Sequence, residues 1–344
     1  MDTLLLLTIL IVICALVFDF INGFHDTANA IATSVSTKAL KPRHAIVMAA
    51  IMNFLGAMTF TGVAKTITKD IVNPYTLDNG SVVILAALLA AIAWNLITWY
   101  FGIPSSSSHA IIGAIAGAAI AASGFATLNY KGFIKIIEAL ILSPIIAFVL
   151  GFIVYSIVKL IFKDSNLAKT NKRFRRVQIL TAAIQSYTHG TNDAQKAMGI
   201  ITMALMTANL HKSDAIPFWV QLSCALAMGL GTSIGGWKII KTVGGKIMKI
   251  RPVNGVSADL TGAAIIFGAT FIHLPVSTTH VISSSILGVG ASHRVKGVNW
   301  GTAKRMLITW VITLPIAGTL GAIAFFILDL FSDDIRFFTE AVFL

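Results

Sequence analysis

The stretch GFHDTANAIATSV, residues 23–35, follows an apolar run and brings polar residues into sequence that otherwise has the composition of a helix. From Thr3 to Phe18 the chain carries no charged residue, and an acid, an imidazole and amides then arrive within eleven positions. Polar residues inside an apolar helix are expensive to bury, so they indicate a site or a structural contact. They are Asp19, Asn22, His25, Asp26 and Asn29.

The composition of the chain is that of an integral membrane protein. Of its 344 residues 56% are hydrophobic and only 12% are charged, and the mean hydropathy is +0.84, whereas a soluble domain carries roughly 25% charged residues. Several charge-free segments are close to or longer than the ~20 residues with which a helix crosses a bilayer. The alternation typical of barrel strands is missing, so the sequence predicts an all-α, polytopic helical bundle. The charge-free segments are 44–64, 82–130, 139–158, 215–237, 260–293 and 306–328.

The net charge of +12 is concentrated in a few loops. Eighteen of the 26 Lys and Arg residues lie in segments 36–43, 163–176, 237–257 and 291–305. A bias of this kind marks the cytoplasmic loops of membrane proteins. We therefore expect these loops in the cytoplasm and expect no nucleic-acid partner. The N-terminus has neither a basic region nor a small-residue cleavage site, so we expect no cleaved signal peptide.

Two motifs occur twice, in the same order. HGTNDAQKAMGIIT, residues 189–202, matches NGFHDTANAIATSV, residues 22–35, at an offset of 167 (189 minus 22). PVSTTHV, from Pro275, matches PSSSSHA, from Pro104, at an offset of 171 (275 minus 104). Two pairs at nearly the same offset predict an internal duplication.

The duplication and the charges together predict an inverted repeat. We expect each half to contain a helix through its polar motif, a second helix, a proline-broken pair that crosses twice or folds back as a re-entrant hairpin, and a final helix. The number of crossings is then odd, so the halves face opposite ways, with both termini outside and the basic loops inside. Many secondary transporters are built in this way. The expected units are a first repeat at 1–162, a basic cytoplasmic linker at 163–176 and a second repeat at 177–344.

A proline followed by hydroxyl residues, a histidine and small residues predicts a helix that begins inside the membrane. Proline is tolerated in the first turn, and Ser and Thr satisfy amides that have no intrahelical partner. Such a helix end carries about +0.5 charge and free N–H donors, which suits an oxyanion. The alternative is that the hydroxyls only cap a kinked helix. The candidate residues are Ser105, Ser106, Ser107, Ser108, Ser277, Thr278 and Thr279.

The acids Asp26 and Asp193 lie deep in apolar sequence, where a carboxylate costs at least ~2.5–3.5 kcal/mol. Asn29, Asn192 and Gln195 lie beside them and add carbonyl oxygens. Oxygen-rich clusters of this kind bind small hard cations or relay protons. The alternative is a pair of structural helix caps.

The other polar residues give weaker indications. His25 can carry a proton near neutral pH, and Lys196 either neutralises Asp193 or extends toward the interface. We expect Asp19 and Glu138 to be interfacial charges or solvated caps. We expect His109 and His280 to be buried and to form hydrogen bonds. His189 and His273 are expected to pack or to form hydrogen bonds. Cys14 and Cys224 are expected to lie in the core, without a disulfide or a structural metal site.

The segment GTSIG, residues 231–235, matches the nucleophile elbow of hydrolases and makes an intramembrane hydrolase a remote alternative. That elbow needs a strand before it and a helix after it, whereas the preceding run is helical, and Ser233 has no counterpart in the first half. We expect its glycines to allow close helix packing instead. An ion channel is a third class, but deep acids on broken helices without a ring of pore-lining charge favour an alternating site.

The two pairs of motifs resemble the signatures of the inorganic phosphate transporter (PiT) family over essentially the whole chain. The resemblance implies a plasma-membrane protein with an inverted-repeat fold that carries orthophosphate with a coupling cation, often as a homodimer. We expect phosphate to be bound by the hydroxyl residues that follow the two prolines and by Gln195. The cation would be bound by Asp26, Asn29, Asn192, Asp193 and His25.

The first motif departs from the family's more usual Gly-Ala-Asn-Asp, because this chain has Gly23-Phe24-His25-Asp26. That form resembles the bacterial low-affinity branch, which co-transports protons and accepts metal–phosphate complexes. The departure leaves sodium coupling open. Some relatives carry sulfate, so a sulfate permease of the same fold is the alternative function.

Charge counting predicts symport without reference to the family. Two helix ends supply about +1 in total, and Lys196 can add one more charge. Two aspartates bring −2, and phosphate brings between −1 and −2. The loaded site would stay negative in a low dielectric, which is very unfavourable. H⁺, Na⁺ or a divalent metal such as Mg²⁺ therefore has to enter with the anion, and no other cofactor is expected.

Overall fold

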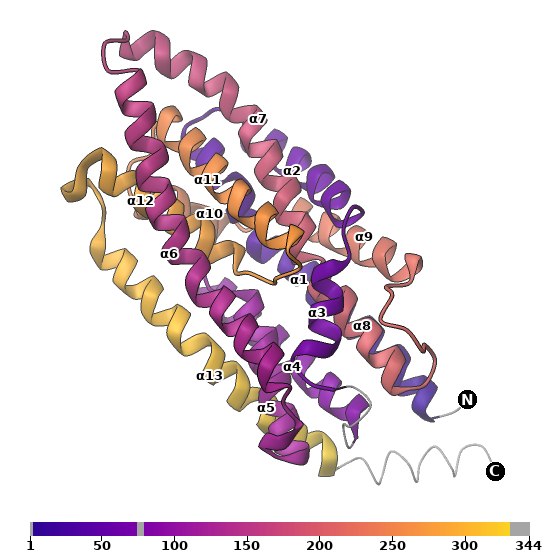
Figure 1. Cartoon of the computed structure of the whole chain (residues 1–344). Helices are drawn as coiled ribbons and strands as arrows, with labels where there is room; N and C mark the ends of the chain where they lie inside the picture. The colour runs from indigo at the N-terminus through magenta and orange to yellow at the C-terminus, as the bar shows by residue number, and fades with distance from the viewer. Residues whose placement is uncertain (1–2, 74–78, 331–344) are drawn as a thin grey trace.

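The computed structural model describes residues 3–73 and 79–330, which form helices joined by short connections (Figure 1). These two ranges contain no strand. Their only β-type backbone pairing is in two isolated bridges, Val72 with Leu128 and Met248 with Val298. The predicted all-α architecture is therefore confirmed. Residues 331–344, which the sequence assigns to the outside, lie beyond the described ranges.

The described part of the first half contains helices of very different length. They are α1 (Thr3–Ser36), α2 (Pro42–Ala57), α3 (Gly62–Asp70), α4 (Gly80–Phe101), α5 (Ser107–Ser123), the 3-10 turn η1 (Phe125–Thr127) and α6 (Tyr130–Ile161).

The second half presents similar elements in a similar order, with one extra break after Asp193. Its relation to the first half as an inverted repeat remains a prediction. The elements are α7 (Leu167–Asp193), α8 (Gln195–Thr207), α9 (Phe218–Ile234), α10 (Trp237–Lys241), the π-helical turn η2 (Thr242–Lys246), α11 (Pro252–Phe271), α12 (Thr278–Arg294), η3 (Val295–Gly297) and α13 (Trp300–Leu330).

Four of the described helices, α1, α4, α6 and α13, are long and apolar enough to cross a membrane. Two bent pairs qualify as well if each counts as one span: α2 with α3, bent by 68°, and α9 with α10 and η2, bent by 62°. The long helices expose apolar side chains, among them Ile141 and Leu142 on α6 and Val311 on α13. Because water would penalise such a surface, it suits contact with lipid.

The bent pairs correct the expectation of a single second helix in each half. In the second half the bend occurs at Gly235, which follows the last residue of α9 and has a φ of +75°. That left-handed conformation is accessible to glycine without a Cβ clash and redirects the chain.

The helices that follow the two prolines begin close to the expected positions. Ser106 and Ser277 cap α5 and α12, because each hydroxyl accepts a hydrogen bond from the amide three residues on, at 3.1 and 3.2 Å. Pro104 and Pro275 lie in the connections before the caps, not in the first helical turns. A serine is the better cap because its oxygen satisfies an otherwise unpaired amide.

Each short helix after a break packs against the last helix of the other half. Gly117 of α5 lies directly against the backbone of Gly318 in α13, and Gly288 of α12 lies against the backbone of Phe148 in α6. The absence of side chains at the two helical glycines permits this close approach. The crossed packing brings the beginnings of α5 and α12 together in the interior.

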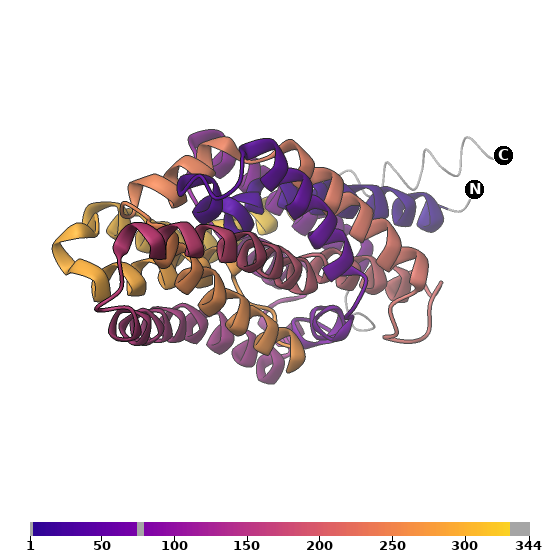
Figure 2. The same cartoon turned by 90° about the horizontal axis from the view of Figure 1, so that it is seen from above.

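Several helix ends and connections lie at two opposite ends of the molecule. In Figure 1 the α6–α7 and α12–α13 connections lie toward one end, and the first turns of α1 and last turns of α13 lie toward the other. Figure 2, at right angles, again separates the α12–α13 connection from the start of α1. Two of the basic loops thus lie away from the start of α1.

Candidate functional site

Asp26, in the C-terminal part of α1, is contacted by both helices that follow a break. Ser107 of α5 donates a hydrogen bond to Asp26 Oδ2 at 3.0 Å, and Thr279 of α12 donates to Asp26 Oδ1 at 3.2 Å. The Asp26 side chain is only 2% exposed. One buried carboxylate therefore joins the first turns of two helices from different halves of the chain.

Asp193, the last residue of α7, is paired with Lys196 of α8. The lysine Nζ lies 3.0 Å from Asp193 Oδ2 and donates to the Ser107 hydroxyl at 2.9 Å. Thr278 donates to the same Asp193 oxygen at 3.3 Å. Both members of the ion pair are fully buried. Lys196 thus neutralises Asp193 and does not extend toward the interface.

His25 lies between Asp26 and the end of α4. Its Nδ1 is 2.6 Å from Asp26 Oδ1, and its Nε2 is 3.0 Å from the Thr98 hydroxyl. The Ser105 hydroxyl donates to Thr98 at 2.8 Å. Both nitrogens of this buried imidazole are therefore held by polar partners.

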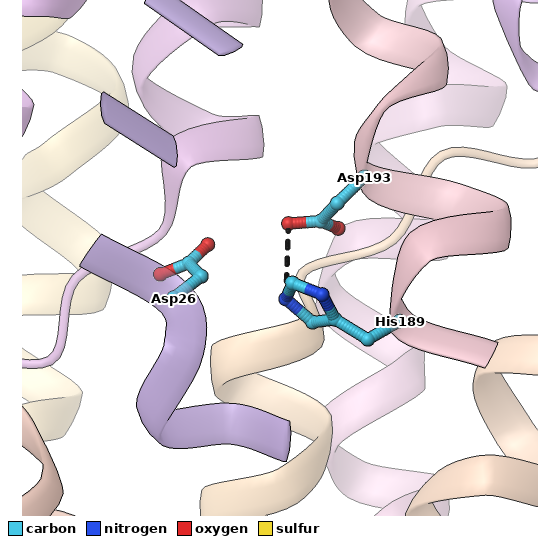
Figure 3. A group of neighbouring side chains, drawn as sticks. All are labelled: Asp26, His189 and Asp193. Carbon is cyan, nitrogen blue, oxygen red and sulfur yellow. Dashed lines mark ion pairs between the residues drawn. The ribbon is translucent and has the colours of Figure 1, made fainter. Parts of the chain in front are cut away.

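His189 belongs to the same cluster, although the sequence suggested only a packing or hydrogen-bonding role. Its Nδ1 lies 2.9 Å from Asn53 Oδ1, and its Nε2 lies 3.5 Å from Asp193 Oδ2. Figure 3 shows Asp26 on α1 facing Asp193 and His189 on α7. One potential ligand atom from each residue lies within 4.8 Å of the others. The spacing of four residues between His189 and Asp193 was an available signal, because it puts both on one helix face.

Two oxygens beside this cluster have no hydrogen-bond partner within the described residues. They are Asn29 Oδ1 and Asp193 Oδ1, and both are buried. The other end of Asn29 is occupied, because its amide nitrogen donates to the Thr279 hydroxyl at 2.8 Å. Buried acceptors without donors are unfavourable unless a proton or cation reaches them.

The two other amides predicted to act in the site are engaged elsewhere. Asn192 donates to Thr270 at 3.0 Å and accepts from the amide of Val276 at 3.3 Å, so it holds the connection before α12. Gln195 accepts from the amide of Ala64 at 3.0 Å and thereby joins α8 to α3. In this conformation neither side chain offers a free carbonyl oxygen to a ligand.

The predicted hydroxyl residues separate into groups by their partners. Ser107, Thr278 and Thr279 contact the acids, whereas Ser106 and Ser277 cap helices. Two more are bonded within the protein: Ser105 to Thr98, and Ser108 to the Val276 carbonyl at 2.8 Å.

His109 and His280 meet behind the two caps. Their ring centroids are 4.5 Å apart, and His280 stacks on Trp310 at 4.1 Å. His109 Nδ1 lies 2.8 Å from the Ser106 hydroxyl. The two imidazoles thus support the starts of α5 and α12 through a ring contact that no sequence pattern specified.

The two acids expected at the interface lie in different environments. Asp19 is fully buried, so that expectation is wrong for it, whereas Glu138 is exposed on α6. The reason is that α1 begins at Thr3 and extends over 34 residues. Asp19 therefore lies near the middle of the helix.

The segment that matches a hydrolase elbow is helical. Ser233 is exposed and donates to the Leu230 carbonyl at 2.6 Å within α9. Gly231 lies against the backbone of Phe20 in α1, which is the close packing expected of these glycines. No strand precedes the serine, so the elbow is not formed.

Comparisons with known proteins agree on one family. The model of the phosphate transporter family matches residues 22–170 and 162–321. A probable low-affinity inorganic phosphate transporter of Bacillus subtilis (strain 168) is 91% identical over 331 residues, which cover 96% of this chain and 99% of that protein. One of Rhizobium meliloti (strain 1021), with the same name, is 45% identical over 92% of this chain and 95% of that protein. A solved structure described as the sodium-dependent phosphate transporter matches with a TM-score of 0.83 and 26% identity, over 94% of this chain and 99% of that one.

Proposed function

Because this chain belongs to the phosphate transporter family, we propose that it is a secondary transporter that imports inorganic phosphate together with a cation. The family and its relatives are transporters, not enzymes. The observation that carries the proposal is the position of Asp26, which is bonded to the first turns of both α5 and α12. A ligand at this point can contact both halves of the chain at once.

Phosphate is assigned to the beginnings of α5 and α12. The first amides of each helix have no intrahelical partner, and each helix end carries about +0.5 charge. The hydroxyls of Ser107, Thr278 and Thr279 donate to the two acids in this structure, and they become donors to the anion once a cation occupies the carboxylates. Lys196 adds a full positive charge beside Ser107. These are the groups that bind an oxyanion in a site closed to water.

The charges of the site support cation coupling. Asp26 and Asp193 contribute −2, Lys196 contributes +1, and the two helix ends contribute about +1. The empty site is then close to neutral, and phosphate would bring −1 to −2 into a low dielectric. A cation that enters with phosphate removes this excess charge, which would otherwise be very unfavourable.

The cation is assigned to the space among Asp26, His189 and Asp193. The ligand atoms of these residues lie within 4.8 Å of one another, and Asn29 Oδ1 beside them has no partner. Carboxylate and amide oxygens suit Na⁺ or Mg²⁺, and the His25–Asp26 contact at 2.6 Å suits a proton. A divalent metal could equally enter as part of a metal–phosphate complex.

Transport would proceed by alternating access in the plasma membrane, with the basic linker 163–176 in the cytoplasm. The breaks before α5 and α12 allow these helices to move relative to α4 and α11 while their first turns keep hold of the ligand.

Uptake of labelled phosphate into proteoliposomes tests the proposal if the Na⁺ gradient, the pH gradient and Mg²⁺ are varied separately. We expect at least one of the three to drive accumulation above equilibrium. Uptake that follows the phosphate gradient alone in all three arms would exclude symport. No phosphate uptake by the wild type under any condition would exclude the substrate.

A further inference from the structure

Asp19 is the one acid of α1 that the site described above does not use. It lies seven residues before Asp26, which is about 10 Å along the helix. Its side chain is fully buried, and neither carboxylate oxygen has a hydrogen-bond partner among the residues that the structure describes. Asp26 and Asp193, in contrast, both have partners at 3.0 Å or closer.

The surroundings of Asp19 contain another unsatisfied oxygen. Asn22 lies one turn along the same helix and is also fully buried, and its carbonyl oxygen has no partner in the described part of the chain. The Asn22 nitrogen lies 3.5 Å from Asp193 Oδ2. Three buried acceptor atoms, two on Asp19 and one on Asn22, thus occur within one turn of α1 without a well-formed hydrogen bond, and among the described side chains the Asn22 amide is the one donor that acts on Asp19.

Titratable groups on three other helices face Asp19, and two of them carry a charge. Lys196 on α8 attracts it, Asp193 on α7 repels it, and the buried Cys224 on α9 lies within range of its charge. Lys196 is committed to Asp193 at 3.0 Å and to Ser107 at 2.9 Å. The lysine therefore does not form an ion pair with Asp19 in this structure.

We propose that Asp19 and Asn22 form a second cation-binding position, separate from the cluster of Asp26, His189 and Asp193. A buried carboxylate and a buried amide oxygen without well-formed hydrogen bonds are stabilised when a cation binds between them. One carboxylate supplies a single negative charge, and the positive charge of Lys196 nearby disfavours a divalent ion. The ligand class is therefore a small monovalent cation, Na⁺ or a proton.

This inference rests on the proposed function only in that the second cation would be one of the coupling ions. Binding itself can be measured without phosphate. The Asp26→Asn variant serves as the background, because it removes one acid of the first cluster while the Asp193–Lys196 pair stays in place. Thermal unfolding of the purified variant is then followed against Na⁺, with choline keeping the ionic strength constant, and separately against pH from 6 to 8.

We expect the Asp26→Asn protein to unfold at a higher temperature with Na⁺ or at lower pH. A hundredfold excess of ligand over its dissociation constant should raise the Tm by roughly 5 °C. Adding Asp19→Asn should abolish that rise, whereas adding Glu138→Gln, which removes an exposed acid of α6, should preserve it. A response to Na⁺ at fixed pH identifies the metal ion, and a response to pH alone identifies the proton.

Asp19→Asn is nearly isosteric and removes a buried charge, so the variant should fold. Asp19→Glu provides a second readout, because it keeps the carboxylate and should keep a cation response with altered affinity. Equal Na⁺ and pH responses with and without Asp19→Asn would overturn the proposal and leave buried water as the partner of these oxygens. If the wild type does not take up phosphate, only the proposed function is contradicted, and the cation-binding proposal is not affected.

Discussion

At the scale of single residues, the site holds its two central carboxylates by different means. Asp26 is bonded to two hydroxyls and His25, whereas Asp193 is paired with the ammonium group of Lys196. A partnered buried carboxylate tolerates the low dielectric, because its partners replace the lost hydration. Asp26→Asn, which leaves no buried lysine without its counter-charge, should therefore affect ligand binding more than folding. Asp193→Asn leaves Lys196 without its buried counter-charge and should also lower stability.

Asp26→Asn and Asp193→Asn should each abolish phosphate uptake while leaving the protein inserted. Either change removes one negative charge and with it one attachment point for the cation. Uptake into cells or proteoliposomes, normalised to the amount of inserted protein, measures the effect. Glu138→Gln is the matched control and should transport normally, since Glu138 is exposed on α6. Full transport by either aspartate variant would remove that residue from the site.

Two neighbouring serines should respond differently to replacement by alanine. Ser107 contacts both Asp26 and Lys196, whereas Ser108 donates to a backbone carbonyl. Ser107→Ala should raise the phosphate concentration for half-maximal uptake by roughly 10- to 100-fold, because a hydrogen bond to a charged group contributes about 1.5–3 kcal/mol. Ser108→Ala should have a much smaller effect in the same assay. Equal shifts in the two variants would argue against a binding role for Ser107.

The sequence predicted part of the constellation at this scale. Asp26 and Asp193 are recognisable because carboxylates are rare in apolar segments. His189 was not recognised as a member of the cluster, and Asn192 and Gln195 bind backbone groups in place of the expected ligands. Which end of a side chain faces a ligand depends on contacts between distant segments, and spacing along the chain does not encode them.

At the scale of elements, the beginnings of α5 and α12 were predictable because Ser106 and Ser277 lie at cap positions. The bends between α2 and α3 and between α9 and α10 were not expected. A bent pair keeps the same apolar composition as a straight helix, so hydropathy alone does not reveal it. The crossed packing of α5 on α13 likewise depends on both partners.

That packing can be tested at Gly117. A Cβ atom there would overlap the carbonyl oxygen of Gly318, whereas one at Gly268 on α11 would meet nothing within 4 Å. Gly117→Ala should lower the Tm of the detergent-solubilised protein by several degrees, because backbone must move to make room. Gly268→Ala is the matched control and should leave the Tm unchanged or slightly higher, since alanine favours a helix. The same Tm change in both variants would contradict the packing.

At the scale of the whole molecule, the charge distribution predicts which end faces the cytoplasm. A cysteine in place of the exposed Ser165, within the α6–α7 connection, should react only with reagents that enter the cell. One in place of Ser213, which is exposed between α8 and α9, should react with impermeant reagents from outside. The reason is the basic bias of the linker 163–176. Identical accessibility of the two thiols in intact cells would show that the segment of α7 and α8, which lies between them, does not cross the membrane as the predicted topology requires.

The choice of anion is also a property of the whole molecule, because both halves of the chain contribute residues to the candidate site. Phosphate near neutral pH keeps a proton, whereas sulfate has none. A carboxylate close to the anion can accept a hydrogen bond from HPO₄²⁻ or H₂PO₄⁻, but it faces only lone pairs on sulfate. An unmatched polar partner in a buried site can give discrimination of ~10⁴ or more.

Asp26 is the carboxylate expected to accept this hydrogen bond, because it is bonded to Ser107 and Thr279 at the beginnings of α5 and α12. An anion held by those helix ends lies beside the Asp26 carboxylate. We therefore expect arsenate, which keeps its proton, to inhibit labelled phosphate uptake, and a large excess of sulfate to have no effect. Strong inhibition by sulfate would show that the acids serve only the cation, and it would make a sulfate permease the better description of this protein.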